Sequence, residues 1–368
     1  MKLEKKKEEG GIALIIVMIS ILVLGVLAGG FAYSMKVETR LAQNANSESE
    51  LEWIGRSGVE YARWILAQQA MCPQERFDAL TQIWAGGNSG PCATNSGLAD
   101  VQKEVQLGRG SFTWQITDLE RKFNINQLSN PTDPRCAQIL EQAFVVMGVD
   151  PGESVPYVSA ILDWLDTDNN THIQGAENDY YHGLPVPYDA KNGPIDDLSE
   201  LLLVKGVTPE MYWGGVSTNH PPAGAFHQKQ SRFGGRSEDQ GYAVGLFNLF
   251  TPISSGRINI NTASAEVLQL IPGVDPPSAE AIVAGRQGED DGTGMLGPYR
   301  TLDDLRRLPE LNPFVVNALR QFGCDVRSAT FQVQIDAKVG SYTRQFIAVL
   351  GRNLANPRDV QVLNFYWK

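Results

Sequence analysis

The sequence predicts an α+β fold, in which a long N-terminal helix lies on a small antiparallel sheet and a large α-helical insertion interrupts the strands. Three observations lead to this prediction. An uncharged apolar run of 24 residues, Ile12 to Met35, continues into an amphipathic helical pattern. Alternating apolar and polar residues mark strands on both sides of the middle of the chain. The middle itself carries an internal repeat with helix-capping residues.

The apolar run is long enough to cross a membrane, because a helix rises about 1.5 Å per residue and the hydrocarbon core is about 30 Å thick. A lysine-rich leader, residues 1–11, ends in Gly10-Gly11 just before it. A peptidase that cuts there would remove only the leader and keep the helix. The lysines predict that the leader stays in the cytoplasm, with the rest of the chain across the membrane. An ordinary anchor is the simpler interpretation, but helical spacing without proline continues to about Ala70.

Four segments have the alternation of half-buried strands. In Ser111 to Leu119, large apolar residues at every second position face one side, with polar residues between them. The same pattern fills Phe331 to Val339, and Gly340-Ser341 then predicts a turn into the next strand. Tyr342 to Leu350 and Val360 to Trp367 complete the set. We therefore expect an antiparallel sheet whose strands lie before and after a mostly helical stretch of about 120 to 325.

The helical stretch contains two copies of one pattern in the same order, which predicts two related helical units. Both copies carry polar caps and a proline in the first helical turn. The matching pairs are Phe123–Asn126 with Ile258–Asn261, Gly148–Pro151 with Gly273–Pro276, and Asp196–Leu201 with Asp303–Leu308. The predicted organisation is a leader (1–11), a transmembrane segment (12–35), a helix with the first part of the α/β domain (36–118), a first helical unit (119–256), a second (257–325) and C-terminal strands (326–368).

Composition excludes some classes of function. A net charge of −11 over 368 residues argues against nucleic-acid binding and favours cations. No sequence signature of a hydrolase, zinc enzyme or nucleotide-binding loop is present, so we predict that the chain is not an enzyme. Four cysteines suit an oxidising compartment. Cys72 and Cys92 bracket a Gly- and Ser-rich loop and are predicted to form a disulfide, whereas a further pairing of Cys136 with Cys324 stays open.

The most specific candidate site is the 12-residue loop Asp166–Glu177. Side-chain oxygens stand at its first, third and fifth positions and a glutamate closes it, as in an EF-hand calcium loop, although Thr171 replaces the usual glycine and no flanking helices are evident. The alternative is a solvated acidic loop. The predicted calcium ligands are Asp166, Asp168, Asn170, His172 and Glu177. Additional candidate ligands are the neighbours Asp163 and Asp179 and a second group, Asp189, Asn192, Asp196 and Asp197, for which a helix N-cap is an equal alternative.

A second motif, residues 261–305, resembles the helix-hairpin-helix of DNA-binding competence proteins. In that motif the hairpin presents backbone N–H groups to a phosphate and needs a second glycine two residues after the first. Here the first glycine is Gly273 and the second position holds Asp275, a negative charge that opposes a phosphate. We therefore expect a helix-packing unit that binds no nucleic acid.

The leader, its terminal glycine, the apolar helix and the amphipathic continuation resemble the type IV pilin and pseudopilin class over about 60 residues. The resemblance implies cleavage by prepilin peptidase between Gly11 and Ile12, followed by methylation. Most members of the class carry glutamate at the fifth mature position, where this chain has Ile16. Within the class, that absence points to the K-type minor pseudopilins of type II secretion. Asp163 to Asp168, followed by Gly175-Ala176-Glu177, also resembles the calcium-binding stretch of that family.

The resemblance implies a pilin-like fold with two inserted helix-hairpin-helix or SAM-like units and bound Ca²⁺. It also implies a non-catalytic subunit at the pseudopilus tip, which supports initiation of pseudopilus assembly and export across the outer membrane. The expected location is the bacterial inner membrane, single-pass, with the C-terminal domain in the periplasm. Expected partners are the I- and J-type minor pseudopilins, other pseudopilus and inner-membrane secretion components, and prepilin peptidase. Two alternatives stay open, a minor pilin that primes a type IV pilus and a membrane-anchored DNA receptor.

Overall fold

The fold was analysed in a computed structural model, which describes residues 10–88, 92, 97–130, 133–215, 242–287, 297–309 and 311–368. The first nine residues of the predicted leader lie outside this part of the chain. Side chains are not described at residues 10–12, 43, 44 and 46, so the predicted processing position is placed by its backbone alone.

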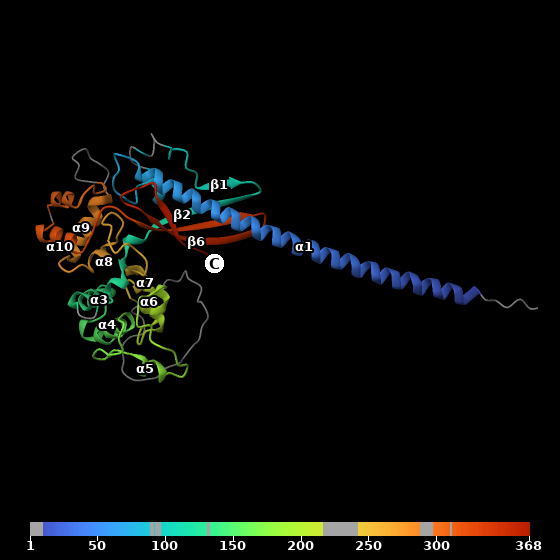
Figure 1. The fold of residues 1–368 in the computed structure, drawn as a ribbon, viewed down its shortest axis with the longest axis horizontal. Helices are drawn as coiled ribbons and strands as arrows, with labels where there is room; N and C mark the ends of the chain where they lie inside the picture. The colour runs from blue at the N-terminus through green and yellow to red at the C-terminus, as the bar shows by residue number, and fades with distance from the viewer. Residues whose placement is uncertain are drawn as a thin grey trace, which may run out of the picture.

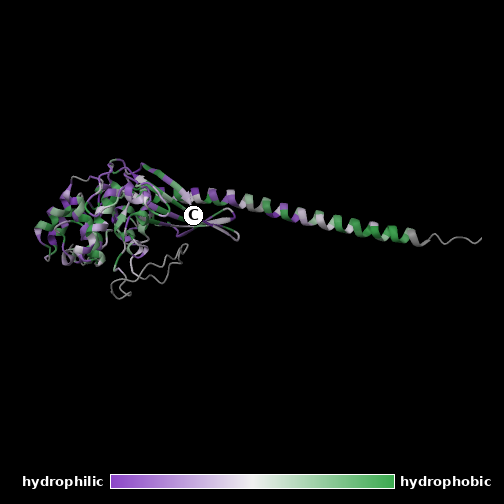
Figure 2. Cartoon of the chain, turned by 90° about the horizontal axis from the view of Figure 1, so that it is seen from below, coloured by the Kyte–Doolittle hydropathy of each residue, from purple (hydrophilic) through white to green (hydrophobic). Residues whose placement is uncertain are grey.

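The N-terminal helix α1 runs without interruption over Gly10–Ala70, 61 residues. Its first half projects as a rod from the rest of the molecule (Figure 1) and is almost entirely apolar (Figure 2). Its large apolar side chains are exposed there, as at Leu22 and Phe31. By length and composition this helix is able to cross a membrane. The predicted continuation of the apolar helix to about Ala70 is confirmed.

The second half of α1 packs on a five-stranded antiparallel sheet of order β1-β2-β5-β6-β7. Two glycines of α1 bring the helix close to the strands, because an added Cβ would lie 2.5 Å from the ring of Phe346 at Gly55 and 2.7 Å from Ile335 at Gly58. An α+β fold with an N-terminal helix on an antiparallel sheet is therefore confirmed. The strands are β1 (Glu104–Leu107), β2 (Gly110–Asp118), β5 (Thr330–Val339), β6 (Tyr342–Arg352) and β7 (Val360–Trp367).

The four predicted strands correspond to β2, β5, β6 and β7, with ends within two residues of those expected. Strand β1 was not predicted. It is a four-residue edge strand with no buried residue, so it lacks the alternation that reveals a half-buried strand. The apolar faces of α1 and the sheet enclose one core, in which Trp84 of η1 (Ile83–Ala85) meets the ring of Phe331 edge-on at 5.3 Å.

The chain between β2 and β5, residues 119–329, forms the helical part of the molecule. Its buried residues make a second, separate core. The first set of elements is η2 (Leu119–Arg121), β3 (Phe123–Asn124), η3 (Ile125–Leu128), α3 (Pro134–Met147), α4 (Pro151–Leu165), α5 (Asn178–His182), η4 (Leu198–Leu203), α6 (Pro209–Trp213), α7 (Leu246–Leu249) and β4 (Phe250–Thr251). The second set is α8 (Ala265–Leu268), α9 (Pro276–Gln287), η5 (Leu302–Arg307) and α10 (Pro313–Gln321).

The asparagines that end the first pair of repeat segments make equivalent hydrogen bonds in the two sets of helical elements. The side chain of Asn126 accepts a hydrogen bond from the backbone N–H of Ile195 at 2.8 Å and donates to its carbonyl at 2.9 Å. The side chain of Asn261 binds Tyr299 in the same way, at 2.9 and 2.8 Å. Each asparagine thus fixes the backbone just before a 3₁₀ helix, η4 or η5, from a distant point in the chain.

The third pair of repeat segments is displaced from its predicted register. Glu200 closes the capping box of η4 by accepting from the backbone N–H groups of Asp196 and Asp197. Asp304 does the same for η5, but it accepts from Arg300 and Thr301. The structure therefore matches residues 196–201 with 300–305, and the predicted match with 303–308 is wrong by three residues. The sequence similarity of the two segments was misleading, because the carboxylate that closes the capping box sets the register and the Asp-Asp pair does not.

A buried polar junction joins the sheet to the second helical set. At the end of β2, Oδ2 of Asp118 accepts hydrogen bonds from the hydroxyls of Thr262 and Ser328, both at 2.6 Å. Nearby, Oε1 of Glu120 accepts from the N–H of Ala329 at 3.0 Å, while its Oε2 has no partner among the described residues. Burial raises the pKa of Asp118 to about 6. Burial and the charge of Asp118 raise the pKa of Glu120 to about 7.

We expect Glu120→Gln to stabilise the protein at pH 8 and to weaken the pH dependence of its stability. Since the carboxyl pKa is raised in the folded state, the wild type binds more protons folded than unfolded and loses stability as pH rises from about 4.5 to 7. A neutral amide has no such loss, and the gain at pH 8 should be about 3 kcal/mol. Melting curves between pH 4 and 8 check this. Parallel pH profiles for variant and wild type would contradict it.

Candidate functional site

The acidic loop is held between two helices, α4 and the five-residue α5, which the sequence did not reveal. Asp166 ends α4 as its C-cap, and Glu177 stands at the N-cap of α5. Both side chains are almost fully buried, 2% and 1% exposed, whereas Asp168 and Asn170 at the tip of the loop are exposed. The first and last carboxylates therefore lie inward, away from solvent.

Asp163, on the last turn of α4, organises this loop. Its carboxylate is fully buried and accepts hydrogen bonds from the backbone N–H groups of His172 at 3.0 Å and Ala176 at 2.6 Å. The ring Nδ1 of His172 also lies within hydrogen-bond distance of Asp163. A Cβ at Gly175 would lie 1.9 Å from Oδ2 of Asp163, so only glycine fits there. Asp163, which the sequence suggested only as an additional candidate ligand, thus directs its oxygens at the loop backbone.

Several buried oxygen atoms of the loop have no hydrogen-bond partner among the described residues. They are Oδ2 of Asp166, both carboxylate oxygens of Glu177, and Oδ1 of Asn192. Buried polar atoms are almost always satisfied, so an unsatisfied group of oxygens indicates a missing partner. Oxygen is also the ligand atom that Ca²⁺ prefers, and a bidentate glutamate is typical of its sites. The residues present therefore fit a calcium ion.

The electrostatic environment of the loop carboxylates also favours a bound cation. Burial raises the pKa of Glu177 to about 7, and the charges of Asp163, Asp166 and Asp168 add to this rise. Burial also raises the pKa of Asp166. Among the described residues, ligand atoms of Asp163, Asp166 and His172 lie within 4.8 Å of one another. Such crowding of carboxylates is unfavourable unless a cation compensates it.

The remaining predicted ligands are placed as follows. Oδ1 of Asp168 accepts from the N–H of Asn170 at 2.7 Å, and the backbone carbonyl of Asp168 accepts from the side chain of Asn192 at 2.6 Å. The ring Nδ1 of His172 is 3.9 Å from Oδ2 of Asp166. Asp179 is exposed in the first turn of α5. Asn192, predicted as part of a second group, is therefore joined to the first loop.

The other three residues of that second group have partners elsewhere. Asp189 is exposed and lies 2.7 Å from the ring of His182. Asp196 forms an ion pair with Lys191 at 2.6 Å. Asp197 is the N-cap of η4, where its side chain accepts from the N–H of Ser199 at 2.8 Å. The helix-cap alternative describes Asp197, and the structure does not bring these three carboxylates together.

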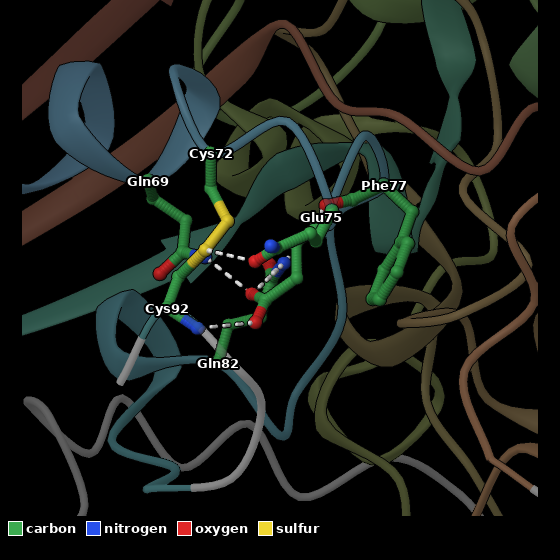
Figure 3. The surroundings of a disulfide bond; sticks show 7 residues. Gln69, Cys72, Glu75, Phe77, Gln82 and Cys92 are labelled. Atoms are coloured by element: carbon green, nitrogen blue, oxygen red, sulfur yellow. Dashed lines mark hydrogen bonds between the residues drawn. A yellow bond between two sulfur atoms is a disulfide. The ribbon is translucent and has the colours of Figure 1, made fainter. Parts of the chain in front are cut away.

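The predicted disulfide between Cys72 and Cys92 is confirmed. It lies just beyond the end of α1, beside the buried carboxylate of Glu75 (Figure 3). Glu75 accepts from the side-chain amides of Gln69 at 2.6 Å and Gln82 at 3.1 Å, and from the N–H of Cys92 at 3.1 Å. The disulfide and this network together anchor the loop to the end of α1.

A bond between Cys136 and Cys324, which the sequence left open, is absent from the structure. Both cysteines are buried and free. Cys136 lies in the first turn of α3, whereas Cys324 follows α10, so each thiol belongs to a different helical set. Their burial as small apolar side chains is sufficient to account for them.

The hairpin before α9 is capped by its own aspartate. Oδ1 of Asp275 accepts from the N–H of Ser278 at 3.0 Å, which occupies a donor at the helix N-terminus. Gly273 has the left-handed conformation, φ +93°, as Gly148 has in the first set, φ +91°. The hairpin geometry is thus kept, while a carboxylate stands where a phosphate would bind.

Two family models match this chain. One, described as type II secretion system protein K, matches residues 121–213, and the other, a helix-hairpin-helix motif, matches residues 254–323. These matches fall on the first and second sets of helical elements. The second agrees with the hairpin predicted from the sequence.

The chain is also similar to curated protein K sequences. It is 24% identical over 212 residues to the putative type II secretion system protein K of Escherichia coli K12, and 32% identical over 111 residues to that of Pectobacterium carotovorum. These alignments cover 56% and 28% of this chain, and span only 60% and 34% of those relatives. The protein K of Aeromonas hydrophila is 24% identical over 366 residues, 95% of each chain.

A solved structure, the GspK–GspI–GspJ complex of the enterotoxigenic Escherichia coli type 2 secretion system, contains a chain of the same fold. The TM-score is 0.62 at 19% identity, with 89% of this chain and 99% of that chain covered. The domain match, the relatives aligned along nearly the whole length and the shared fold agree with one another. Residues 121–213 thus match the protein K domain of type II secretion systems, and the chain is similar to the protein K of Aeromonas hydrophila along nearly its whole length.

Proposed function

We propose that this chain is a non-catalytic minor pseudopilin at the tip of the type II secretion pseudopilus, where it supports the start of pseudopilus assembly and protein export across the outer membrane. The observation that carries the proposal is the combination of one unbroken helix α1, apolar and exposed in its first half, with a bulky helical part inserted between β2 and β5. The apolar half anchors the subunit in the inner membrane and later packs in the filament core, with the C-terminal domain in the periplasm.

The tip position follows from size and charge. The inserted residues make the subunit wider than a helix on a five-stranded sheet alone, so a further layer does not stack above it. Ile16 supplies no carboxylate for the N-terminal amine of a neighbouring subunit. A buried carboxylate without a cationic partner is costly, and a subunit at the end of the filament has no such partner.

The partners proposed are the I- and J-type minor pseudopilins, because the similar chain was solved in a complex with GspI and GspJ. Other pseudopilus and inner-membrane secretion components and the prepilin peptidase complete the set. We expect contact along the exposed side of α1, where Leu41 and Trp53 are 61% and 70% exposed. Association there would bury these apolar side chains.

The proposed cofactor is Ca²⁺, held by the loop between α4 and α5. The ligands supported best are Asp166, Glu177 and Asn192, because their buried oxygens lack partners within the described part of the chain. When bound, the ion compensates the crowded carboxylates and fixes α5 relative to α4. Its role here is structural, as expected for a subunit without catalytic residues.

A deletion strain tests the function. Loss of this gene should stop or strongly reduce release of type II substrates, and a plasmid copy should restore it. Affinity purification of the complemented chain from membranes should recover the I- and J-type subunits. Normal secretion combined with loss of surface pili would favour the priming of a type IV pilus instead. DNA retention by the purified chain that weakens with salt would favour a DNA receptor.

We expect the mature protein to begin at Ile12, because the leader ends in glycine and α1 continues through this position. N-terminal sequencing or intact mass of the membrane-extracted protein measures this, and an added methyl group should appear on the new N-terminus. Gly11→Leu should block cleavage and leave the whole leader in place. A chain that keeps Met1, or that begins beyond Tyr33, would contradict the pseudopilin proposal.

A further inference from the structure

A hollow of about 280 Å³ lies at the C-terminal end of α1, between this helix end and the turn that follows β6. Ala70 and Met71 form one side, and Leu354 and Pro357 form the other. The hollow therefore lies at the C-terminal end of α1, and the apolar segment occupies the other end of this helix (Figure 1). It is also far along the chain from the calcium loop and shares no residue with it.

Three arginines line the hollow. Arg76 is exposed at its rim, and Arg327 is half-buried with its guanidinium donating to the carbonyl of Leu354 at 3.1 Å. Arg352 is 4% exposed; it is bonded to Asp78 and Ser328 through Nη2, while its Nε and Nη1 have no partner within the described residues. In that part of the chain, neither Arg76 nor Arg327 forms an ion pair. The floor and rim therefore carry positive charge that the protein does not fully compensate.

The two carboxylates beside the hollow are already engaged. Glu75 is buried and accepts from Gln69, Gln82 and the N–H of Cys92, and Asp78 accepts from Arg352 and the N–H of Ser328. Three guanidinium groups thus face two occupied carboxylates. Such a positive hollow on a chain of net charge −11 attracts anions locally.

From this geometry we propose that the hollow binds an acidic peptide segment of another protein, with Arg76 and Arg327 holding its carboxylates. Guanidinium groups match carboxylates through paired, charge-assisted hydrogen bonds. The volume distinguishes a peptide from a single inorganic ion, because about 280 Å³ is roughly nine times the space of one water molecule. Beneath these two arginines, Arg352 is paired with Asp78, and its Nε and Nη1 have no partner within the described residues.

The test uses the full chain in detergent micelles, with excess calcium held constant because acidic peptides bind calcium themselves. The fluorescence anisotropy of a labelled peptide with four consecutive acidic residues should rise on binding, with a Kd below about 1 mM. The same peptide with the corresponding amide residues in place of the acidic ones should not bind. Arg76→Gln and Arg327→Gln should each weaken binding at least about fivefold. Arg306→Gln, a remote exposed arginine on η5, should change the Kd by less than about twofold.

Equal melting temperatures of the variants and the wild type would exclude misfolding as the cause of weaker binding. Because Arg76 is exposed, its substitution should disturb the fold less than that of Arg327. Sulfate serves as the inorganic probe. Acidic peptide that binds Arg76→Gln and the wild type equally, or that fails to bind the wild type at about 1 mM, would overturn the proposal. Sulfate that competes as well as the peptide at equal concentration would overturn the peptide assignment, and competition only at far higher concentration would support it.

Discussion

Removing calcium with a chelator is expected to lower the melting temperature of the detergent-solubilised mature chain by about 5 °C. An ion that binds only the folded state adds about 2.7 kcal/mol when present at a hundred times its Kd, and even a site of about 10⁻⁴ M fills outside the cytoplasm. The physical reason is the group of buried oxygens on Asp166, Glu177 and Asn192 that lack partners within the described residues. The measurement is a thermal melt in excess calcium and in excess chelator.

Glu177→Ala should abolish the difference between the two melts, because it removes the bidentate ligand. In chelator the variant should be no less stable than the wild type, since the carboxyl it loses is buried and repelled by its neighbours. Asp189→Ala is the matched control: its carboxylate is exposed and bonded to His182, so its calcium response should persist. Identical wild-type melts in calcium and in chelator would leave the loop without a cation role.

The second large effect is expected at the ion pair of Asp78 with Arg352. Both side chains are buried, 2% and 4% exposed, and Asp78 also accepts from the N–H of Ser328 at 2.8 Å. Asp78→Ala should destabilise the protein by about 3–5 kcal/mol, because removal of one partner leaves a buried, unpaired charge. Denaturant unfolding measures the change. The pair lies where the loop after α1 meets β5 and β6, so the sheet domain should lose the most stability.

Asp303→Ala is the control for this prediction. Its carboxylate also pairs with an arginine, Arg320, at 3.0 Å. Both side chains are at least half exposed, 59% for Asp303 and 50% for Arg320. Exposed ion pairs contribute little because water and salt screen them. A loss of stability at Asp78 no greater than that at Asp303 would show that the buried pair is not needed for folding.

Much of the fold was predictable from local patterns in the sequence. The apolar run and the absence of proline predicted α1 to Ala70, and alternation predicted β2, β5, β6 and β7. These predictions succeeded because helix and strand periods depend on neighbours a few residues apart. Strand β1 was not predicted because it is a short edge strand in which only Val105 packs against the core, so no alternation develops.

The position of the candidate site along the chain was predictable, but the contacts within the site were not. Ligand spacing marked the loop Asp166–Glu177, and the Cys72–Cys92 loop marked the disulfide. The roles of Asp163 and Asn192 were not predictable, because they depend on which backbone groups reach them: Asp163 turns to His172 and Ala176, and Asn192 joins the loop from 24 residues away.

By itself, the sequence determined the membrane-length helix, the strand alternation, the presence of a helical repeat and an oxygen-rich loop. Tertiary structure alone decided the register of that repeat, the isolation of Cys136 from Cys324, and which carboxylates are satisfied and which are left without partners. The reason is physical. Hydrophobic periodicity is a local property of the chain, whereas the pairing of a buried polar atom depends on groups brought to it from distant segments, as at Asp118, Thr262 and Ser328.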